Sequence, residues 1–224
     1  MGFLHTIVNN ILDIVFPIYC LSCQKRGEYL CLNCLSESPV AMRESASWIF
    51  PMFDYRHPPI KKDIWFLKYN GKRNLASVFA EAIHGHILEE LADRKTMENF
   101  NQAILIPIPI SRHRRRERGF NQTELIAEAL AKIDQNQNFT IRTDILIKKD
   151  DTTHQARIES RRARIDNIKD SFLISPKIDL YQNLKRKNII LLDDVTTTGA
   201  TLSEARRILK EFGARKVIAF TVAH

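Results

Sequence analysis

The 224-residue sequence has no apolar run that approaches the roughly 20 residues needed to cross a bilayer. Residues 1–19 also lack the basic region that begins a secretory signal peptide. With 44% hydrophobic and 27% charged residues, the composition is typical of a globular domain with a core of its own. We therefore expect no membrane span and a cytoplasmic location.

Glycine is scarce, with seven residues in the whole chain. The stretch Asn188–Leu202, around which the chain is organised, contains one glycine, Gly199. It therefore lacks the repeated glycines of a Rossmann fingerprint, and it lacks the Gly-Lys-Ser/Thr ending of a Walker A loop. Two common nucleotide-binding motifs are excluded here.

The same stretch instead predicts a strand, an acidic pair, a hydroxyl-rich loop and a helix. Asn188 to Leu192 has the aliphatic composition of a buried parallel strand. Asp193 and Asp194 follow at once. After the loop, apolar residues recur at helical spacing and Gly213 stands at the expected C′ position.

This order of elements predicts a site for a phosphorylated sugar. Backbone N–H groups at a helix start bind phosphate, Gly199 allows close approach, and threonine hydroxyls add donors. Adjacent carboxylates at a strand end cannot share one side of the strand. They suit either two ribose hydroxyls, or one hydroxyl and the shell of a magnesium ion. The alternative is an ordinary strand–turn–helix with a polar turn.

Cysteine is confined to one short segment, where four residues form two C-x-x-C pairs: Cys20, Cys23, Cys31 and Cys34. In a cytoplasmic protein, paired knuckles of this kind predict a closed, structural four-thiolate zinc site. A pair of disulfides is the alternative, and the compartment disfavours it. A redox C-x-x-C does not explain two copies.

The net charge of +8 is concentrated in two segments. Residues 112–118 contain five arginines and one glutamate, a net +4. Residues 157–169 contain five basic and two acidic residues, a net +3. This local excess indicates an anionic ligand, either a polyphosphate or a nucleic-acid backbone, although solvated surface is the alternative.

Strands and helices are expected to alternate along the chain, which predicts a mainly parallel sheet with right-handed crossovers. Pro51 limits the first strand to a sheet edge. Asn121 is a candidate helix cap with Glu124 at capping-box spacing. Helices are expected at 3–16, 59–69, 74–93, from 121 and from 202, and strands at 47–55, 103–108, 141–147, 172–174, 188–193 and 216–223.

Residues 189–202 resemble the phosphoribosyl-pyrophosphate (PRPP) motif of type I phosphoribosyltransferases. The whole order of motifs resembles the ComF/GntX family, whose members are linked to bacterial DNA uptake. The motifs are the two cysteine pairs, Lys68–Gly71, Pro107–Pro109, Arg118–Gln122, Gln155 with Arg164 and Asn167, and 189–202. The resemblance implies an α/β fold, type I phosphoribosyltransferase-like, with a mainly parallel twisted sheet flanked by helices. A helix and a small four-cysteine zinc-ribbon module would occupy 1–45, and the phosphoribosyltransferase-like domain 46–224.

The resemblance also implies roles for individual residues. Asp193 and Asp194 would be the catalytic pair that holds the ribose and Mg²⁺. The 5′-phosphate and ribose would be bound by Asp193, Asp194, Thr196, Thr197, Thr198, Gly199, Ala200 and Thr201. Ser111 and Arg112 would form the pyrophosphate loop, and Arg161 or Arg164 would reach the pyrophosphate from a loop at 150–169. Ala200 departs from the family's usual second glycine.

Two functions of different classes follow. In the first, the protein transfers ribose from Mg–PRPP to an acceptor that the sequence does not name. In the second, it is a non-catalytic competence protein that binds single-stranded DNA through Arg114, Arg115, Arg116 and Arg118, together with the zinc module. Against the second, aromatic residues are not interleaved with these arginines, and Phe120 is the nearest.

Overall fold

The computed structural model describes residues 17–42, 46–135, 137–150, 170–177 and 184–224. Five parallel strands form the main sheet, in the order β1, β7, β6, β2, β3. A separate antiparallel ribbon pairs β4 with β5. The strands are β1 (Ile49–Phe53), β2 (Ala103–Pro107), β3 (Phe139–Ile141), β4 (Leu146–Lys148), β5 (Phe172–Ile174), β6 (Asn188–Val195) and β7 (Lys216–Ala223).

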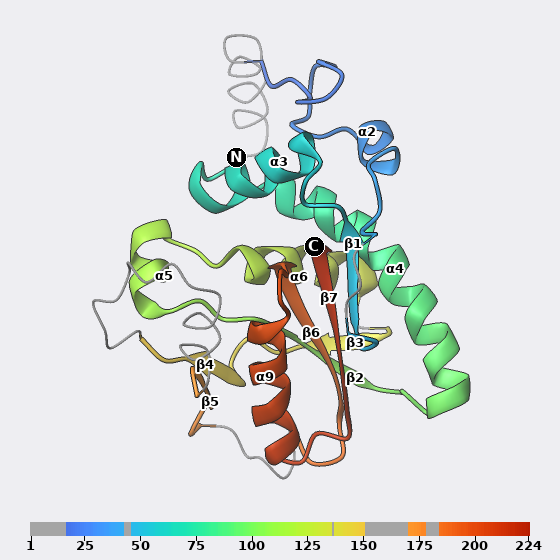
Figure 1. Ribbon diagram of the computed structural model, residues 1–224, viewed down its shortest axis with the longest axis vertical. Coiled ribbons are helices and arrows are strands. Elements are labelled where there is room, and N and C mark those ends of the chain that lie inside the picture. The colour runs from blue at the N-terminus through green and yellow to red at the C-terminus, as the bar shows by residue number, and fades with distance from the viewer. Residues whose placement is uncertain (1–16, 43–45, 136, 151–169, 178–183) are drawn as a thin grey trace, which may run out of the picture.

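Helices cover both faces of this sheet, and Figure 1 shows α9 in front of the strands with α6 behind them. Helices α2 and α3 lie above the end of the sheet at which β7 finishes (Figure 1). The described helices are α2 (Leu32–Ser36), α3 (Pro58–Tyr69), α4 (Leu75–Glu98), α5 (Arg112–Arg118), α6 (Gln122–Asp134) and α9 (Ala200–Glu211).

The alternation of side chains along the central strand β6 creates two apolar layers. Ile190 and Leu192 belong to a core shared with α3, α4 and α6. Ile189 and Leu191 point to the other face, into a core shared with α9 and the β4–β5 ribbon. All four are fully buried, as expected for a parallel strand covered on both faces.

The order of the strands places a topological switch point between β2 and β6. The chain passes from β2 to β3 on one side of β2, whereas β6 lies on its other side. Ile108, just after β2, donates its N–H to the carbonyl of Leu192 at 2.8 Å, so the two strand ends remain together. Ligands of open α/β sheets bind at such a point, beyond the carboxyl ends of the strands.

The mainly parallel sheet and the edge position of the strand that contains Pro51 are confirmed. The single strand predicted over 141–147 is wrong. Its two ends belong to different sheets, because the chain turns between β3 and β4 and Arg142 pairs with Asp144 in the turn. The helix predicted over 74–93 continues to Glu98 and ends where Asn99 adopts a left-handed conformation.

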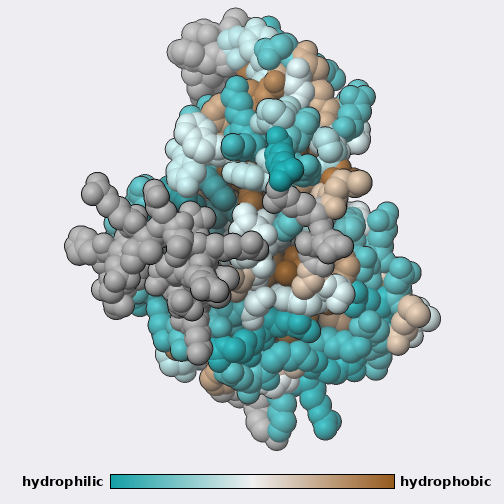
Figure 2. Space-filling view, viewed as in Figure 1, coloured by the Kyte–Doolittle hydropathy of each residue, from teal (hydrophilic) through white to brown (hydrophobic). Residues whose placement is uncertain are grey.

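Other predictions fall outside the described residues. They are the amphipathic helix at 3–16 and almost the whole loop at 149–169, including Arg161 and Arg164. Among the helices that the structure does describe, even the longest does not have the apolar stretch that a bilayer crossing requires. The lower part of Figure 2 is mostly hydrophilic, and Lys210 and Glu211 of α9 are exposed.

Candidate functional site

The acidic pair lies at the carboxyl end of β6, next to the switch point. Asp194 is buried, whereas Asp193 is only partly covered. The backbone N–H of Asp194 donates to Oδ1 of Asp193 at 2.8 Å. Because side chains alternate along a strand, the two carboxylates leave β6 on opposite sides.

Burial and the neighbouring charge of Asp194 raise the pKa of Asp193 to about 7. The hydrogen bond from the N–H of Asp194 and the positive charges of Lys68 and Lys148 act in the opposite direction. A carboxylate pair with a shifted pKa, close to a switch point, is typical of a functional site.

Lys68 is the partner that sequence reasoning missed. Its Nζ lies 2.8 Å from Oδ1 of Asp194, and the side chains are 19% and 5% exposed. The lysine stands in the last turn of α3, so a helix above the sheet contacts the acidic pair directly. Lys68 is the first residue of the Lys68–Gly71 motif, but the sequence alone does not connect it to Asp194.

Oδ2 of Asp194 is buried and has no hydrogen-bond partner among the described residues. A buried carboxylate oxygen without a partner is costly unless a ligand or cation satisfies it. Carboxylate oxygens are also the ligands that Mg²⁺ prefers. The residues present therefore fit a hydroxyl-bearing ligand with an associated Mg²⁺ ion.

The hydroxyl-rich loop connects β6 to α9 and is anchored at its base to β7. Thr196 donates its N–H to the carbonyl of Ala223 at 3.0 Å. The carbonyl of Thr197 lies 3.1 Å from Nε2 of His224. The side chains of Thr197 and Thr198 are exposed above this base.

Gly199 provides the N-cap of α9 in a left-handed conformation, with φ of +71°. This conformation favours glycine, and a Cβ at this position would also lie 3.0 Å from Cδ1 of Ile49, which would have to shift slightly. Because glycine has no side chain to cap the helix, the first turn of α9 keeps N–H groups for an anion. The predicted residues from Asp193 to Thr201 are thus brought together on one strand, one loop and one helix start.

Ser111 and Arg112 follow β2, on the other side of the switch point. Ser111 caps α5 by accepting a hydrogen bond from the N–H of Arg114 at 3.4 Å. The N–H of Arg112 donates to Oδ1 of Asp150 at 2.8 Å. The two residues expected in the pyrophosphate turn thus lie at the N-terminus of α5, where Asp150 contacts the backbone.

The arginine cluster forms the exposed helix α5, in which no residue is buried. Arg115 pairs with Glu124 at 2.8 Å, so Glu124 serves this ion pair. Arg118 donates to the hydroxyl of Tyr69 at 3.0 Å and stacks over its ring at 4.6 Å. Tyr69 in turn lies beside Trp65, with ring centroids 5.9 Å apart.

These two aromatic side chains correct the expectation that Phe120 is the aromatic residue nearest to the arginines. Trp65 and Tyr69 are 49% and 55% exposed, and both come from α3, which precedes α5 by a long stretch of chain. Phe120 is buried and lies under the guanidinium of Arg73. Aromatic and basic groups therefore meet in space although they are separate in sequence.

The four cysteines form one cluster in which the sulfur atoms all lie within 4.8 Å of one another. Although burial raises the pKa of the Cys20 thiol, backbone hydrogen bonds from Cys23 and Cys31 lower it to about 6. Four soft sulfur ligands in this arrangement can hold a metal ion, and their chemistry fits Zn²⁺.

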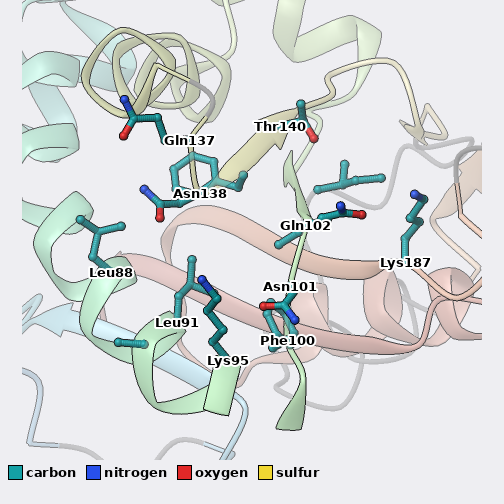
Figure 3. Close-up of a pocket in the computed structure, with 14 residues that line it drawn as sticks. Leu88, Leu91, Lys95, Phe100, Asn101, Gln102, Gln137, Asn138, Thr140 and Lys187 are labelled. Carbon is teal, nitrogen blue, oxygen red and sulfur yellow. The ribbon is translucent and has the colours of Figure 1, made fainter. Parts of the chain in front are cut away.

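An open pocket of about 1030 Å³ lies at the opposite end of the sheet from the acidic pair. Figure 3 shows amide side chains and two lysines, Lys95 and Lys187, around it, with Leu88, Leu91 and Phe100 as apolar walls. It is bounded by the beginnings of β2 and β3, so it is separate from the site at the end of β6.

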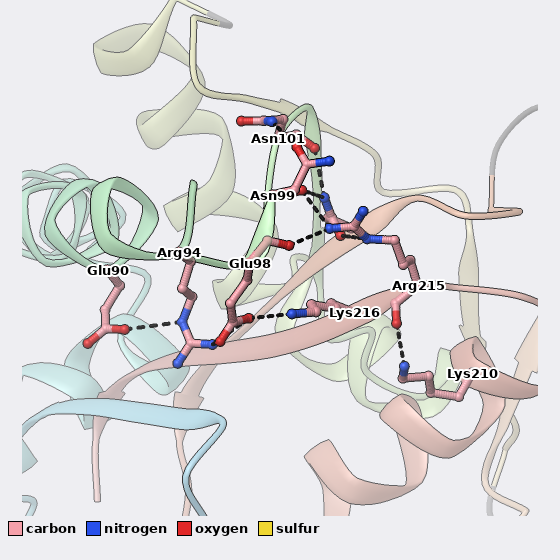
Figure 4. A network of polar contacts seen from close by, with 9 residues as sticks. Glu90, Arg94, Glu98, Asn99, Asn101, Lys210, Arg215 and Lys216 are labelled. Carbon is pink, nitrogen blue, oxygen red and sulfur yellow. Dashed lines mark hydrogen bonds and ion pairs between the residues drawn. The ribbon is translucent and has the colours of Figure 1, made fainter. Parts of the chain in front are cut away.

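This amino end of the sheet is held by a polar network that joins the end of α4 to the starts of β6 and β7 (Figure 4). Glu98 accepts from Lys216 at 2.8 Å and pairs with Arg94. Arg215 donates to the carbonyls of Glu98 and Asn99. The network is structural, because each of these groups is satisfied by a neighbour within the fold.

This chain is similar to several known proteins. Residues 127–224 match the family described as Phosphoribosyl transferase domain. The Competence protein ComFC of Bacillus subtilis is 34% identical over 120 residues, which are 53% of this chain and 43% of that protein. The match therefore spans less than half the length of that relative.

A second relative matches over a longer span. The Competence protein F of Haemophilus influenzae is 25% identical over 206 residues, 90% of this chain and 82% of that protein. Among solved structures, a hypoxanthine phosphoribosyltransferase from Staphylococcus aureus aligns with a TM-score of 0.36 and 9% identity. That alignment covers 66% of this chain and 62% of the other.

Proposed function

The chain belongs to the ComF family and contains a phosphoribosyltransferase-like domain, and from this premise we propose that it binds Mg–PRPP or a related phosphoribosyl ligand. The observation that carries the proposal is the acidic pair at the switch point. Asp194 in this pair has a buried oxygen without a partner among the described residues. The hydroxyl-rich loop follows directly and leads to Gly199, the N-cap of α9. A ribose with its phosphate matches this sequence of groups along one strand end.

Each part of the site then has a role. Asp193 and Asp194 bind the ribose hydroxyls and the ion, and a bound Mg²⁺ neutralises charge on the pyrophosphate. Residues 196–201 bind the 5′-phosphate through N–H and hydroxyl donors. Ser111 and Arg112 are on the pyrophosphate side, where a guanidinium forms bidentate contacts with phosphate oxygens.

The reaction that such an arrangement supports is transfer of the ribosyl group. The bond between C1 of the ribose and the pyrophosphate oxygen breaks, and the electron pair leaves with pyrophosphate. An acceptor nucleophile forms the new bond to C1 and releases its proton to solvent. Since the transition state resembles an oxocarbenium ion, the protein contributes mainly by positioning and charge neutralisation.

Calorimetry of the zinc-loaded full chain with PRPP and Mg²⁺ tests the proposal. We expect binding by the parent protein and a loss of about tenfold or more in affinity in Asp193→Asn and Asp194→Asn, because each removes a charged ligand group. Asp144→Asn is the matched control, since this carboxylate is more than half exposed and already paired with Arg142. Unchanged PRPP affinity in both site variants would contradict the assignment.

Turnover is measured separately, by pyrophosphate release in the presence of a panel of nucleobases and amines. Release that depends on one acceptor would identify the protein as a transferase and name its substrate. Binding of PRPP without release with any acceptor would support a binding protein that has kept the ligand site but not the reaction.

We infer a second candidate function, single-stranded DNA binding during competence, from the surface formed by α5 with Trp65 and Tyr69. Guanidinium groups that track a backbone and exposed rings that stack on bases are the two components of such sites. Arg114 and Arg116 have no ion pair among the described residues. Their charges are therefore available to phosphates.

Fluorescence anisotropy with single-stranded DNA at several salt concentrations tests this function. Replacing Arg114, Arg115 and Arg116 by alanine is expected to reduce the salt slope by up to about two, because each lost phosphate contact removes about 0.7. Tyr69→Ala is expected to weaken binding at every salt concentration without this change of slope. Lys210→Ala on α9 is the control, and an intact affinity and slope in the triple variant would rule out α5.

The cysteine cluster is proposed to bind one structural zinc ion within a module of residues 1–45, ahead of a phosphoribosyltransferase-like domain of residues 46–224. Four clustered thiols that hold a metal require a reducing compartment, which supports a cytoplasmic location. Partners from the competence machinery are proposed on the names of the relatives alone.

A further inference from the structure

We propose that Lys68 is a built-in counter-cation of the acidic pair, which excludes a bare divalent cation and releases Asp194 only to a cation that arrives with an anionic ligand. The inference rests on the proposed phosphoribosyl site and adds an order of binding to it. The observation behind it is a lysine from α3 that already occupies one oxygen of a buried carboxylate at this site.

The contact between Lys68 and Asp194 is well shielded from water. The distance from Nζ to Oδ1 is 2.8 Å, and Asp194 is 5% exposed. A charge pair in such surroundings interacts more strongly than an exposed pair, and removing one partner leaves the other uncompensated. The second oxygen of Asp194 is buried without a partner among the described residues, so the carboxylate is only half satisfied.

The charges around the pair determine what can approach it. Lys68 comes from α3, and Lys148 from β4 also acts on Asp193. A divalent ion that enters alone meets the ammonium of Lys68 at short range and is repelled by it. When the ion arrives with a pyrophosphate group, the negative charge of the pyrophosphate gives the displaced ammonium a new partner.

The residue type suits this exchange. An ammonium is a compact charge on a flexible four-carbon stem, so it can move from a carboxylate to a phosphate by rotating its side chain. The docking of α3 does not depend on this contact, because Ile60, Ile64 and Leu67 are fully buried beneath the helix. Replacement of the ammonium is therefore expected to keep α3 docked, while the unpaired carboxylate of Asp194 lowers the free energy of unfolding.

The test measures binding of Mn²⁺, a probe for Mg²⁺, to the zinc-loaded full chain in the absence of PRPP. Water-proton relaxation detects bound Mn²⁺ directly. Lys68→Met removes the charge and keeps the apolar stem. We expect it to bind bare Mn²⁺ about tenfold tighter than the parent protein, since one repelling charge is lost next to two carboxylates.

Two variants serve as controls. Lys68→Arg keeps the charge and is expected to bind bare Mn²⁺ as weakly as the parent protein. Lys62→Met removes a charge from the same helix at an exposed position beside Phe66, and no change is expected. Adding Asp194→Asn to Lys68→Met is expected to abolish the gain in Mn²⁺ affinity.

The opposite sign is expected with the anionic ligand present. Lys68→Met should bind Mg–PRPP more weakly than the parent protein, because the variant has no ammonium group that can contact the pyrophosphate. A merely structural lysine would weaken both kinds of binding together, so the divergence of the two affinities is the distinguishing result. Mn²⁺ affinity in folded Lys68→Met that is no higher than in the parent protein overturns the proposal.

Two outcomes are independent of these variants. Tight binding of bare Mn²⁺ at the acidic pair of the parent protein, with no help from PRPP or inorganic pyrophosphate, also overturns the proposal. If the parent protein fails to bind PRPP but Mn²⁺ and pyrophosphate enhance each other's binding, the proposed phosphoribosyl function fails while the role of Lys68 is supported.

Discussion

Asp134, at the end of α6, shows how a single buried carboxylate can control the stability of this fold. Its side chain is fully buried and accepts hydrogen bonds from the N–H and amide of Asn138, and Nε2 of His84 lies 3.2 Å away. Although burial alone raises the pKa of Asp134, these hydrogen bonds lower it overall below its ordinary value of 3.8.

The sign of the resulting pH dependence follows from this shift. Because the folded-state pKa is below that of the unfolded chain, Asp134 stabilises the fold at pH values above about 4. The contribution is lost as the pH falls through the folded-state pKa. Asp134→Asn is expected to lower the free energy of unfolding at pH 7 by about 2 kcal/mol and to flatten its decline below pH 4.

Urea denaturation at pH 7 and at pH 3 measures both effects. Asp144→Asn is the control, because that carboxylate is more than half exposed and its pair with Arg142 is expected to contribute little. A decline below pH 4 that is equally steep in Asp134→Asn and in the parent protein would show that other carboxylates dominate.

At the residue scale, the sequence predicted groups whose partners lie nearby in the chain. Asp193, Gly199 and the four cysteines are parts of short motifs, so their chemistry can be inferred from spacing. Lys68 was not predicted, because its contact with Asp194 depends on how α3 packs above the sheet. The stacking of Arg118 on Tyr69 was missed for the same reason.

At the element scale, the start of α6 is joined to the end of β2 by Asn121. Its Oδ1 accepts from the N–H of Thr123 at 3.2 Å, and its Nδ2 donates to the carbonyl of Ile108 at 3.1 Å. The hydroxyl of Thr123 donates to the same carbonyl at 2.7 Å. Asn121 therefore caps the helix and fixes the turn that leads to Ser111.

Asn121→Ala is expected to reduce the free energy of unfolding by about 2–3 kcal/mol, because it removes a cap and leaves buried polar groups without partners. Ser111→Ala is the matched cap variant on α5, where the single hydrogen bond is long at 3.4 Å. It is expected to cost less than about 1 kcal/mol. Equal losses in urea denaturation would show that Asn121 acts only as a cap.

Element types were largely predictable and their ends less so. The caps at Asn121 and Gly213 were recognised because capping depends on residue type and local backbone. The division of 141–147 between two sheets was not, since Ile141 and Leu146 both have strand composition. Ile141 packs against the core that contains α6 and Leu146 lies in the core that contains α9, and no local pattern records that choice.

At the scale of the whole molecule, alternation of strands and helices predicted a parallel sheet but not its order. The switch point between β2 and β6, on which the position of the site depends, arises because β6 pairs with β2 and not with β3. The order is set by long-range contacts between apolar faces. The motif at 189–202 contains the strand end itself, so the site that it predicts lies next to this switch point.

The cysteine cluster is connected to the main core through two leucines that stand next to its ligands. Leu30 precedes Cys31 and Leu35 follows Cys34, and both are buried in the core that α3, α4 and β7 share. Tyr29 also contacts Phe66 of α3, with ring centroids 6.2 Å apart. We therefore expect a change at the cluster to affect α3 and, through Lys68, the acidic pair.

We expect one zinc ion per chain, measured by elemental analysis, and a single thermal unfolding transition that moves to lower temperature when a chelator removes the metal. Cys20→Ser is expected to lose the metal and to unfold at lower temperature, whereas Ser22→Ala, between two ligands, should retain the metal.

If the leucines couple the cluster to α3, the metal-free protein should also bind Mg–PRPP more weakly. Purified protein with four free thiols and no zinc would refute the zinc site, and a metal-free protein with unchanged unfolding would show that the cluster and the main core are independent.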